Sequence, residues 1–454
     1  MIEGNDGGDL DGPVGGAAAT RSRTDLARRL AALFLAGAGE PAQPNGAKRR
    51  VTLFVRIVAA GMVLALAHSF VMTHFLQRGY PYNTFLVGVR NQFMDFFNVN
   101  YNSYDLNPYP RLTPYPPFAM LLARGFACGF DYAAGPLAAR DSPAGRLSYG
   151  ILAGGFCVFL FALVWRGVRT GNRSLDVKLL AALFVSYPIL FVLDRGNYVM
   201  AAFVCLFGFI HFYDKRRFLC VVCLALAISI KLYPAVFLLL LAADRRWRDA
   251  AWVVGLTLVI NVASFPFFRG GLIPNAEQFL RNVFLFAPAK TVFSPMWDAC
   301  WSLSFCNLFR VPYVVFLHRA PDGLPYYYPA IELAAIGALI LALRRERTFW
   351  KRVLAATIAM ICVPSFSQDY NLVYLIIPVL LYFRQSAEFR WQDYFYLASL
   401  GLLFTPKAYY VFEVVDLNAL TPQAFLNPLL LLGLFLALTA PRIFKSSVGA
   451  RLGG

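Results

Sequence analysis

The chain has 454 residues, of which 59% are hydrophobic and only 15% are charged. Ordinary soluble domains are about half apolar and a quarter charged, so this composition indicates a protein that is mostly surrounded by lipid. A formal net charge of +17 would suggest nucleic-acid binding on a soluble protein. Here the basic residues fall in short clusters between apolar runs, which is the pattern that sets membrane topology, and we expect no nucleic-acid partner.

The two ends of the chain differ from the rest. Residues 1–48 are rich in Gly, Asp, Pro and Ala and show no signal-peptide pattern, because the first apolar run starts only at Val51. Their composition predicts a disordered tail. Residues 446–454 form a second short polar end. We expect both ends to be cytoplasmic, on either side of a polytopic membrane domain at 49–445.

Apolar runs follow one another from residue 51 onward, and each is a candidate membrane helix. Several are shorter than the roughly 20 residues that a span requires. The runs are 51–75, 149–168, 179–193, 199–213, 218–230, 235–243, 251–268, 330–343, 353–366, 372–383, 394–405 and 425–440. If the N-terminus is inside, twelve spans place every basic cluster on one side, which the positive-inside rule makes cytoplasmic. The predicted fold is therefore an all-α integral membrane protein with about 12 spans (range about 10–13).

Two long segments fall on the opposite, external side. They cover residues 74–148 and 269–329, and both are rich in Pro, Tyr, Phe and Asn. Transporters usually have short loops and bind their substrates near the middle of the bilayer. Two long external segments, expected to carry short juxtamembrane helices, indicate instead that chemistry takes place at this face.

The first external segment contains an acidic residue among apolar ones, Asp95, followed by Asp105. A carboxylate near the lipid headgroups is partly desolvated, which makes it a better general base. The alternative is a solvated loop aspartate that caps a juxtamembrane helix. Chemistry alone leaves both interpretations open.

The order of several short motifs resembles glycosyltransferase family 87, which includes polyprenyl-phosphate-mannose-dependent mannosyltransferases of the GT-C superfamily. The motifs are Asp95-Phe96 with Tyr101, Asp105-Leu106-Asn107-Pro108-Tyr109, Tyr115-Pro116-Pro117, Asp194-Arg195-Gly196-Asn197, Lys231-Leu232-Tyr233-Pro234 and 364–371. They occur in the family's order between about residues 90 and 380. The resemblance implies a GT-C-type helical bundle and a sugar donor carried on polyprenyl phosphate.

The resemblance also implies roles for individual residues. Asp95 matches the general base of an inverting displacement, and Lys231 and Arg195 are the expected ligands of the donor phosphate. The further substrate-binding candidates are Tyr101, Asp105, Tyr109, Tyr115, Asn197, Gln368, Asp369 and Tyr370. Lys231 as an interfacial anchor and Arg195 as a local partner of Asp194 remain the alternatives. Neither a metal nor a cofactor is implied.

One departure concerns the late motif, where some family members carry a histidine and this chain has Gln368-Asp369. Because Asp369 would repel a phosphate, we expect it to bind acceptor hydroxyls. The donor sugar is expected to be a hexose, most simply mannose, and the acceptor a glycolipid or glycan. The expected location is the cell's inner membrane, with the active site on the external or periplasmic face.

Two other classes of protein share the same features. A transporter or flippase of lipid-linked sugars would also have many spans and intramembrane charges, but it would show internal repeats with matching broken helices, and none is evident. A non-catalytic subunit of a polysaccharide assembly system would tolerate the loss of Asp95.

Overall fold

The computed structural model describes residues 44–79, 91–111, 113–128, 132–292, 301–317, 324–385, 388–409 and 421–439. The predicted tails at 1–48 and 446–454 therefore lie almost entirely outside the described residues. The exception is residues 44–48, which already belong to the first described helix. That helix begins at Pro44, where a proline fits because the first helical N–H has no partner within the helix.

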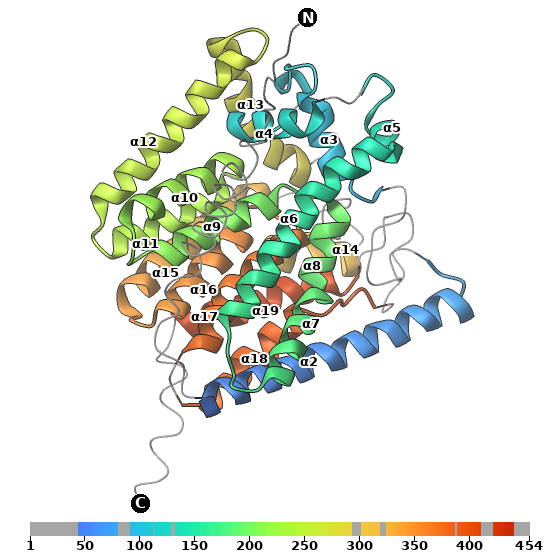
Figure 1. Ribbon diagram of the computed structural model, residues 1–454, viewed down its shortest axis with the longest axis vertical. Coiled ribbons are helices and arrows are strands. Elements are labelled where there is room, and N and C mark those ends of the chain that lie inside the picture. The colour runs from blue at the N-terminus through green and yellow to red at the C-terminus, as the bar shows by residue number, and fades with distance from the viewer. Residues whose placement is uncertain are drawn as a thin grey trace, which may run out of the picture. The chain divides into compact units, whose positions relative to one another are not determined.

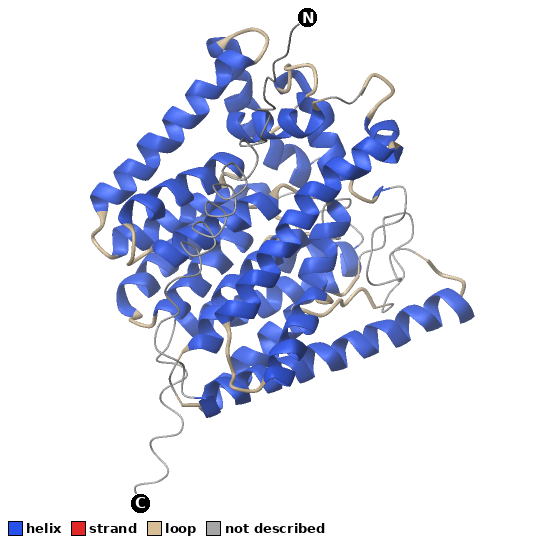
Figure 2. Ribbon diagram, viewed as in Figure 1, coloured by secondary structure: helices blue, strands red, loops and turns tan. Residues whose placement is uncertain are grey.

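The regular elements of the described residues are helical (Figures 1 and 2), apart from an isolated antiparallel bridge between Ser302 and Gln368. In the labels, α marks α-helices and η marks 3-10 or π segments. The elements are α2 (Pro44–Phe70), η1 (Val71–Phe75), α3 (Met94–Ser103), η3 (Tyr109–Arg111), α4 (Pro117–Ala127), α5 (Pro136–Asp141), α6 (Pro143–Gly167), α7 (Arg173–Phe184), α8 (Tyr187–Arg195), α9 (Val199–Phe212), α10 (Arg217–Ile230), η4 (Tyr233–Phe237), α11 (Leu238–Ala243), α12 (Trp247–Ser264), η5 (Phe265–Phe267), α13 (Leu272–Val292), α14 (Asn307–Leu317), α15 (Leu324–Arg345), α16 (Phe349–Cys362), η6 (Asp369–Leu375), α17 (Ile376–Arg384), α18 (Trp391–Leu403) and α19 (Gln423–Thr439).

The protein is a helical membrane protein, but the described helices do not support twelve spans. Four stretches are long and apolar enough to cross a bilayer, namely Asn45–Phe75, Pro143–Gly167, Trp247–Phe267 and Tyr327–Arg345. A fifth is possible if α7 and α8, which meet at a bend of 42°, count as one span. The bend follows from Pro188, the second residue of α8, which has no N–H to continue the preceding helix.

The other apolar runs form shorter helices. Helices α9, α10 and α16 have 14 residues each and α19 has 17, short of the roughly 20 that a span needs. Nearly every side chain of α16 is buried in the protein. A helix that is apolar on all sides can be a core helix as well as a membrane span. Hydropathy alone cannot separate these two cases, and the sequence count therefore came out too high.

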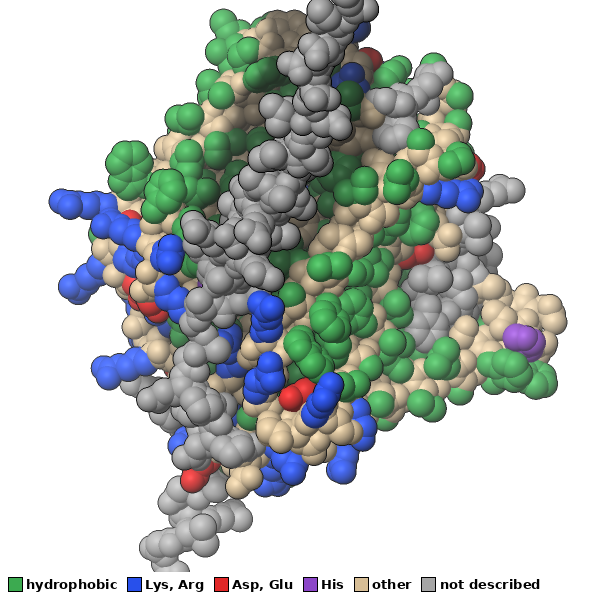
Figure 3. Space-filling model, in the orientation of Figure 1, with side chains coloured by type: hydrophobic (Ala, Val, Ile, Leu, Met, Phe, Trp, Pro, Cys, Tyr) green, Lys and Arg blue, Asp and Glu red, His purple; other side chains and the backbone are tan. Residues whose placement is uncertain are grey.

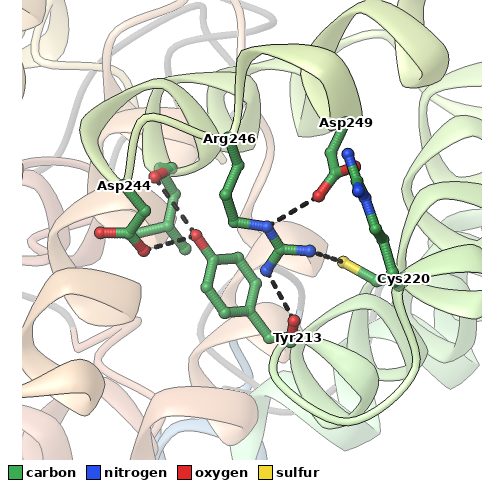
Figure 4. Close-up of polar contacts among 7 residues, drawn as sticks. Tyr213, Cys220, Asp244, Arg246 and Asp249 are labelled. Carbon is green, nitrogen blue, oxygen red and sulfur yellow. Dashed lines mark hydrogen bonds and ion pairs between the residues drawn. The ribbon is translucent and has the colours of Figure 1, made fainter.

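A polar network fastens the ends of α9, α10, α11 and α12 to one another (Figure 4). The Arg246 guanidinium donates to the Tyr213 carbonyl at 2.6 Å and to the Asp249 carboxylate at 2.8 Å. Asp249 also pairs with Arg217. The Tyr213 hydroxyl donates to Asp244 at 2.7 Å. These contacts compensate the buried charge of Asp249, which would otherwise be costly among packed helices.

The surface separates apolar from basic areas. On the face drawn in Figure 3, hydrophobic side chains cover much of the helical surface, whereas Lys and Arg gather at its left and lower edges. Exposed apolar residues such as Val63 of α2, Val158 of α6 and Leu258 of α12 lie on the long helices. An apolar surface of this kind suits helices that face lipid.

Candidate active site

A cavity of about 770 Å³ lies where five of the predicted motifs meet. Its walls come from α3, from the segment between η3 and α4, from the α8–α9 turn, from the α10–η4 turn, from α13 and α15, and from residues 364–371. Seven predicted site residues line it together. They are Asp95, Tyr115, Arg195, Asn197, Lys231, Gln368 and Tyr370.

Asp95 lies in the first turn of α3 and joins this helix to the α8–α9 turn. One of its carboxylate oxygens forms an ion pair with Arg195, and the other accepts a hydrogen bond from the Asn197 side-chain amide at 2.9 Å. Both charged side chains are partly exposed, at 18% for Asp95 and 22% for Arg195. Asp95 is thus an anchored member of the cavity wall rather than a solvated cap of its own helix. Arg195 pairs with Asp95 across the fold, and it also donates to the Asn91 carbonyl at 3.3 Å.

The turn that holds Arg195 and Asn197 depends on Gly196. This glycine has φ +68°, and a Cβ there would come within 3.1 Å of the Phe96 Cβ and 3.2 Å of the Tyr149 ring. A left-handed φ and close packing both favour glycine. The backbone N–H of Phe93 also donates to the Asp194 carbonyl at 2.6 Å, which fixes α3 against this turn. The short motif around Gly196 therefore carries two of the partners of Asp95.

Lys231 directly follows α10 as its C-terminal cap and is only 9% exposed. Its ammonium lies 3.9 Å from the centre of the Tyr115 ring and 5.8 Å from that of Tyr370, a cation–π arrangement. Within the described part of the chain, no hydrogen bond or ion pair joins this ammonium to a protein oxygen. Burial lowers the pKa of Lys231 to about 7, while the charge of Asp95 acts in the opposite direction. A cation without an oxygen partner, beside a cavity, is suited to bind an anionic ligand.

The late segment, residues 364–371, forms the part of the wall that contacts the α10–η4 turn. The Tyr233 hydroxyl donates to Asn371 at 2.8 Å, and the Asn371 amide donates to Ser367 at 3.1 Å. The bridge between Ser302 and Gln368 ties this segment to the predicted second external segment. The segments around Tyr233, Ser302 and Gln368, which are distant in sequence, are thereby held together beside the cavity.

Four predicted site residues do not line the cavity. Tyr109 is fully buried among Phe265, Phe268 and Phe279. Tyr101 stacks on Tyr104, with the Arg111 guanidinium 5.1 Å from its ring centre.

The two acidic members of that group are engaged by protein partners. Asp105 forms a bidentate pair with Arg111, whose closest distance is 2.7 Å. Burial alone would raise the pKa of Asp105, but hydrogen bonds from Arg111 and from the Asn107 backbone outweigh it, and the pKa lies below its ordinary value. Asp369 is 1% exposed and accepts hydrogen bonds from Tyr187 at 2.8 Å and Gln423 at 2.6 Å. Asp105 thus positions a cavity-lining cation, and Asp369 lies behind the wall.

Two charged cavity residues were missed by sequence reasoning. Arg111 lines the space from η3, and Glu332 lines it from α15. Glu332 accepts a hydrogen bond from the backbone of Ser365, which also belongs to the wall. It is the single acidic residue of the apolar run 330–343. An ionisable residue inside a span is a functional candidate by default, so this signal was available.

Comparison with known proteins identifies one matching family. A sequence model described as Glycosyltransferase family 87 matches residues 113–365, which is more than half of the 454 residues. No curated protein and no solved structure matches the chain. The matched segment contains Arg195, Lys231 and Glu332, whereas Asp95 precedes it and Gln368 follows it.

Proposed function

The chain belongs to glycosyltransferase family 87, and we propose that it transfers a hexose, most simply mannose, from a polyprenyl-phosphate donor to a hydroxyl group of a glycolipid or glycan. One observation carries the proposal. A single cavity brings a carboxylate, Asp95, together with a buried ammonium, Lys231, that has no oxygen partner among the described residues. A base and an anion ligand are the two groups that this reaction requires.

In the proposed step, the Asp95 carboxylate accepts the proton of the acceptor hydroxyl as that oxygen bonds to the anomeric carbon. The bond between the anomeric carbon and the phosphate oxygen breaks on the opposite side, and polyprenyl phosphate leaves with the electron pair. A single displacement inverts the configuration and uses no second catalytic carboxylate. Each carboxylate oxygen has two lone pairs, so Asp95 can keep Arg195 and Asn197 as partners and still meet the acceptor.

Charge grows on the phosphate oxygen as the bond breaks, and a fixed cation at that oxygen stabilises it. Lys231 is the proposed ligand, because its ammonium faces the cavity on the rings of Tyr115 and Tyr370. Arg195 contributes mainly by holding Asp95, and Arg111 adds a further cation to the same space. Tyr115, Asn197, Gln368 and Tyr370 are proposed to contact the sugars from the cavity wall.

The lipid-linked donor suits a helical membrane protein, because its tail remains in the bilayer while its head reaches the cavity. We place the active site at the external face of the inner membrane and both termini in the cytoplasm. A cysteine placed at Ala134, an exposed residue of the predicted first external segment, should then react with an impermeant reagent added from outside intact cells. Labelling only after the cytoplasm is opened would reverse the orientation.

A transfer assay tests the function itself. Purified protein receives radiolabelled polyprenyl-phosphate mannose and a lipid extract as acceptor, and the products are separated from the donor. Net transfer of the label to acceptor, dependent on Asp95, supports the enzyme. Movement of intact donor across a vesicle membrane without transfer supports a flippase instead.

A further inference from the structure

A second cavity of about 450 Å³ lies between the N-terminal part of α2 and α18, away from the residues that line the candidate active site. Three basic residues of α2 line it, Lys48, Arg49 and Arg56, together with Tyr394 of α18. The two helices pack against each other, and α2 runs along the edge of the described helices in Figure 1.

The three cations of α2 border the same space. Residues separated by three, four, seven or eight positions share a helix face, and Arg56 follows Arg49 by seven positions and Lys48 by eight. All three are exposed at the residue level, and no acidic side chain lines this cavity among the described residues. Their neighbour Arg50 differs, because it is fully buried and reaches Asp393 at 3.5 Å. The cluster thus contains one neutralised arginine and three cations that share a cavity.

One of these cations is held in place. The Arg49 guanidinium donates to the Tyr394 hydroxyl at 2.6 Å and lies 4.3 Å from the centre of the Phe389 ring. Tyr394 accepts this bond, which leaves its own O–H available to donate. A fixed guanidinium and a hydroxyl donor are suited to the oxygens of a phosphate group.

The same face of α2 becomes apolar immediately beyond Arg56. Ala59, Ala60 and Ala67 are exposed there, and Val63 and Leu66 are 66% and 58% exposed. The opposite side of α2 packs against α7, α17 and α18. A cationic cavity therefore continues into an apolar stripe on a helix long enough to cross the membrane.

From this arrangement we infer that the cavity binds the phosphate group of an anionic phospholipid, whose acyl chains lie along the exposed face of α2. Basic pockets between membrane helices bind anionic headgroups in this way. A soluble phosphate would use the cations but would leave the apolar stripe unused. The inference concerns a structural lipid and does not depend on the proposed transferase activity.

The test compares lipid binding by variants of the full chain. Protein purified in a neutral detergent is titrated with dioleoylphosphatidylglycerol or dioleoylphosphatidylcholine, and bound lipids are counted by native mass spectrometry. Wild type should bind one phosphatidylglycerol more tightly than any phosphatidylcholine. The double variant Lys48→Ser/Arg56→Ser should weaken that binding about 25-fold, because each cation near a lipid headgroup contributes about fivefold.

The matched control is Arg216→Ser/Arg248→Ser, which removes two exposed cations from other basic clusters. It should change the binding by less than about threefold, below the effect of one headgroup cation. A second variant, Tyr394→Phe, keeps the ring and removes the hydroxyl, so it should also weaken binding if the first double variant does not fold. Equal losses in the control, or displacement of the lipid by millimolar inorganic phosphate, would overturn the inference.

Discussion

Asp95 and Arg195 are 100 positions apart in the chain, and their ion pair joins the first turn of α3 to the end of α8. Asn197 holds the other oxygen of the same carboxylate. A carboxylate fixed by two partners has a defined direction in the cavity, which a general base requires. The pair therefore gives Arg195 a positioning role that the sequence motif alone did not indicate.

Asp95→Asn should lower the rate of sugar transfer by at least about a hundredfold, because an amide cannot take the acceptor proton. The substitution also leaves Arg195 without its anion, so we expect a loss of about 1–3 kcal/mol in stability. Initial rates at saturating substrates and thermal unfolding of the same preparation separate the two effects. The control is Asp141→Asn, at an exposed aspartate paired with its neighbour Arg140. If Asp95→Asn keeps more than half of the activity, Asp95 is not the base.

Lys231→Ala should reduce transition-state stabilisation by about 2–4 kcal/mol, measured as the loss in kcat/KM for the donor. This is the usual effect of removing a group that stabilises charge in the transition state. The acceptor KM should change little, because acceptor hydroxyls carry no charge. Lys178→Ala, at an exposed lysine of α7, is the control. Unchanged dependence on donor concentration in Lys231→Ala would leave Lys231 as an interfacial anchor.

The lowered pKa of Lys231, about 7, predicts a pH effect on donor binding. Only the protonated amine attracts the donor phosphate, and the charge of a phosphodiester does not change near neutral pH. The donor KM of wild type should therefore rise with pH above 7, by up to about tenfold per unit. In Lys231→Arg the guanidinium stays charged, so the donor KM should stay flat between pH 7 and 9. A parallel rise in both proteins would assign the effect to another group.

Glu332→Gln should raise the acceptor KM by about tenfold or more while the donor KM stays constant. A carboxylate in the cavity wall can accept hydrogen bonds from sugar hydroxyls, and hydrogen bonds to charged groups contribute about 1.5–3 kcal/mol. Its place in α15, within an apolar stretch, makes an unused charge costly. Glu277→Gln, at an exposed position of α13, is the matched control. An unchanged acceptor KM would remove Glu332 from substrate binding.

Gly196→Ala should destabilise the protein by about 1–2 kcal/mol or more, because φ +68° is unfavourable for a residue with a Cβ. The Cβ would also press on Phe96 and Tyr149, which displaces the turn that holds Asp95. Gly154→Ala tests the opposite case in the middle of α6, where a Cβ meets no atom within 4 Å. It should stabilise the protein by about 0.5–1 kcal/mol. Thermal unfolding of both variants in one detergent measures the difference.

The sequence predicted the helical membrane class, and its resemblance to glycosyltransferase family 87 is confirmed. It did not predict the number of membrane-crossing helices. Leu354 of α16 and Val63 of α2 contribute equally to an apolar run, yet the first is fully buried in protein and the second is 66% exposed. Hydropathy measures transfer out of water and does not distinguish protein from lipid as the destination.

Site residues could be predicted where a local sequence motif determines their position. They could not be predicted where contacts with residues distant in sequence determine it. Lys231 follows an apolar helix and precedes a proline turn, a pattern visible in the sequence. In the sequence, Asp369 looks as accessible as Lys231. In the structure, its partners Tyr187 and Gln423 come from positions 182 and 54 residues away. No local pattern reports such contacts, so neither its burial nor its position behind the cavity wall could be read in advance.

The family match ends at residue 365, but the cavity wall continues to Asn371 and is held from behind by α19 through Asp369 and Gln423. No described residue of α19 lines the cavity. In a deep mutational scan, Gln423 should nevertheless behave like an active-site position, since its loss removes one of the hydrogen bonds that hold Asp369, the residue between Gln368 and Tyr370 of the wall. A fragment trimmed to the matched boundaries would keep Arg195, Lys231 and Glu332, but it would lose Asp95, Arg111 and the back wall of the cavity. The residues that build the candidate active site therefore extend beyond both ends of the segment by which the family is recognised.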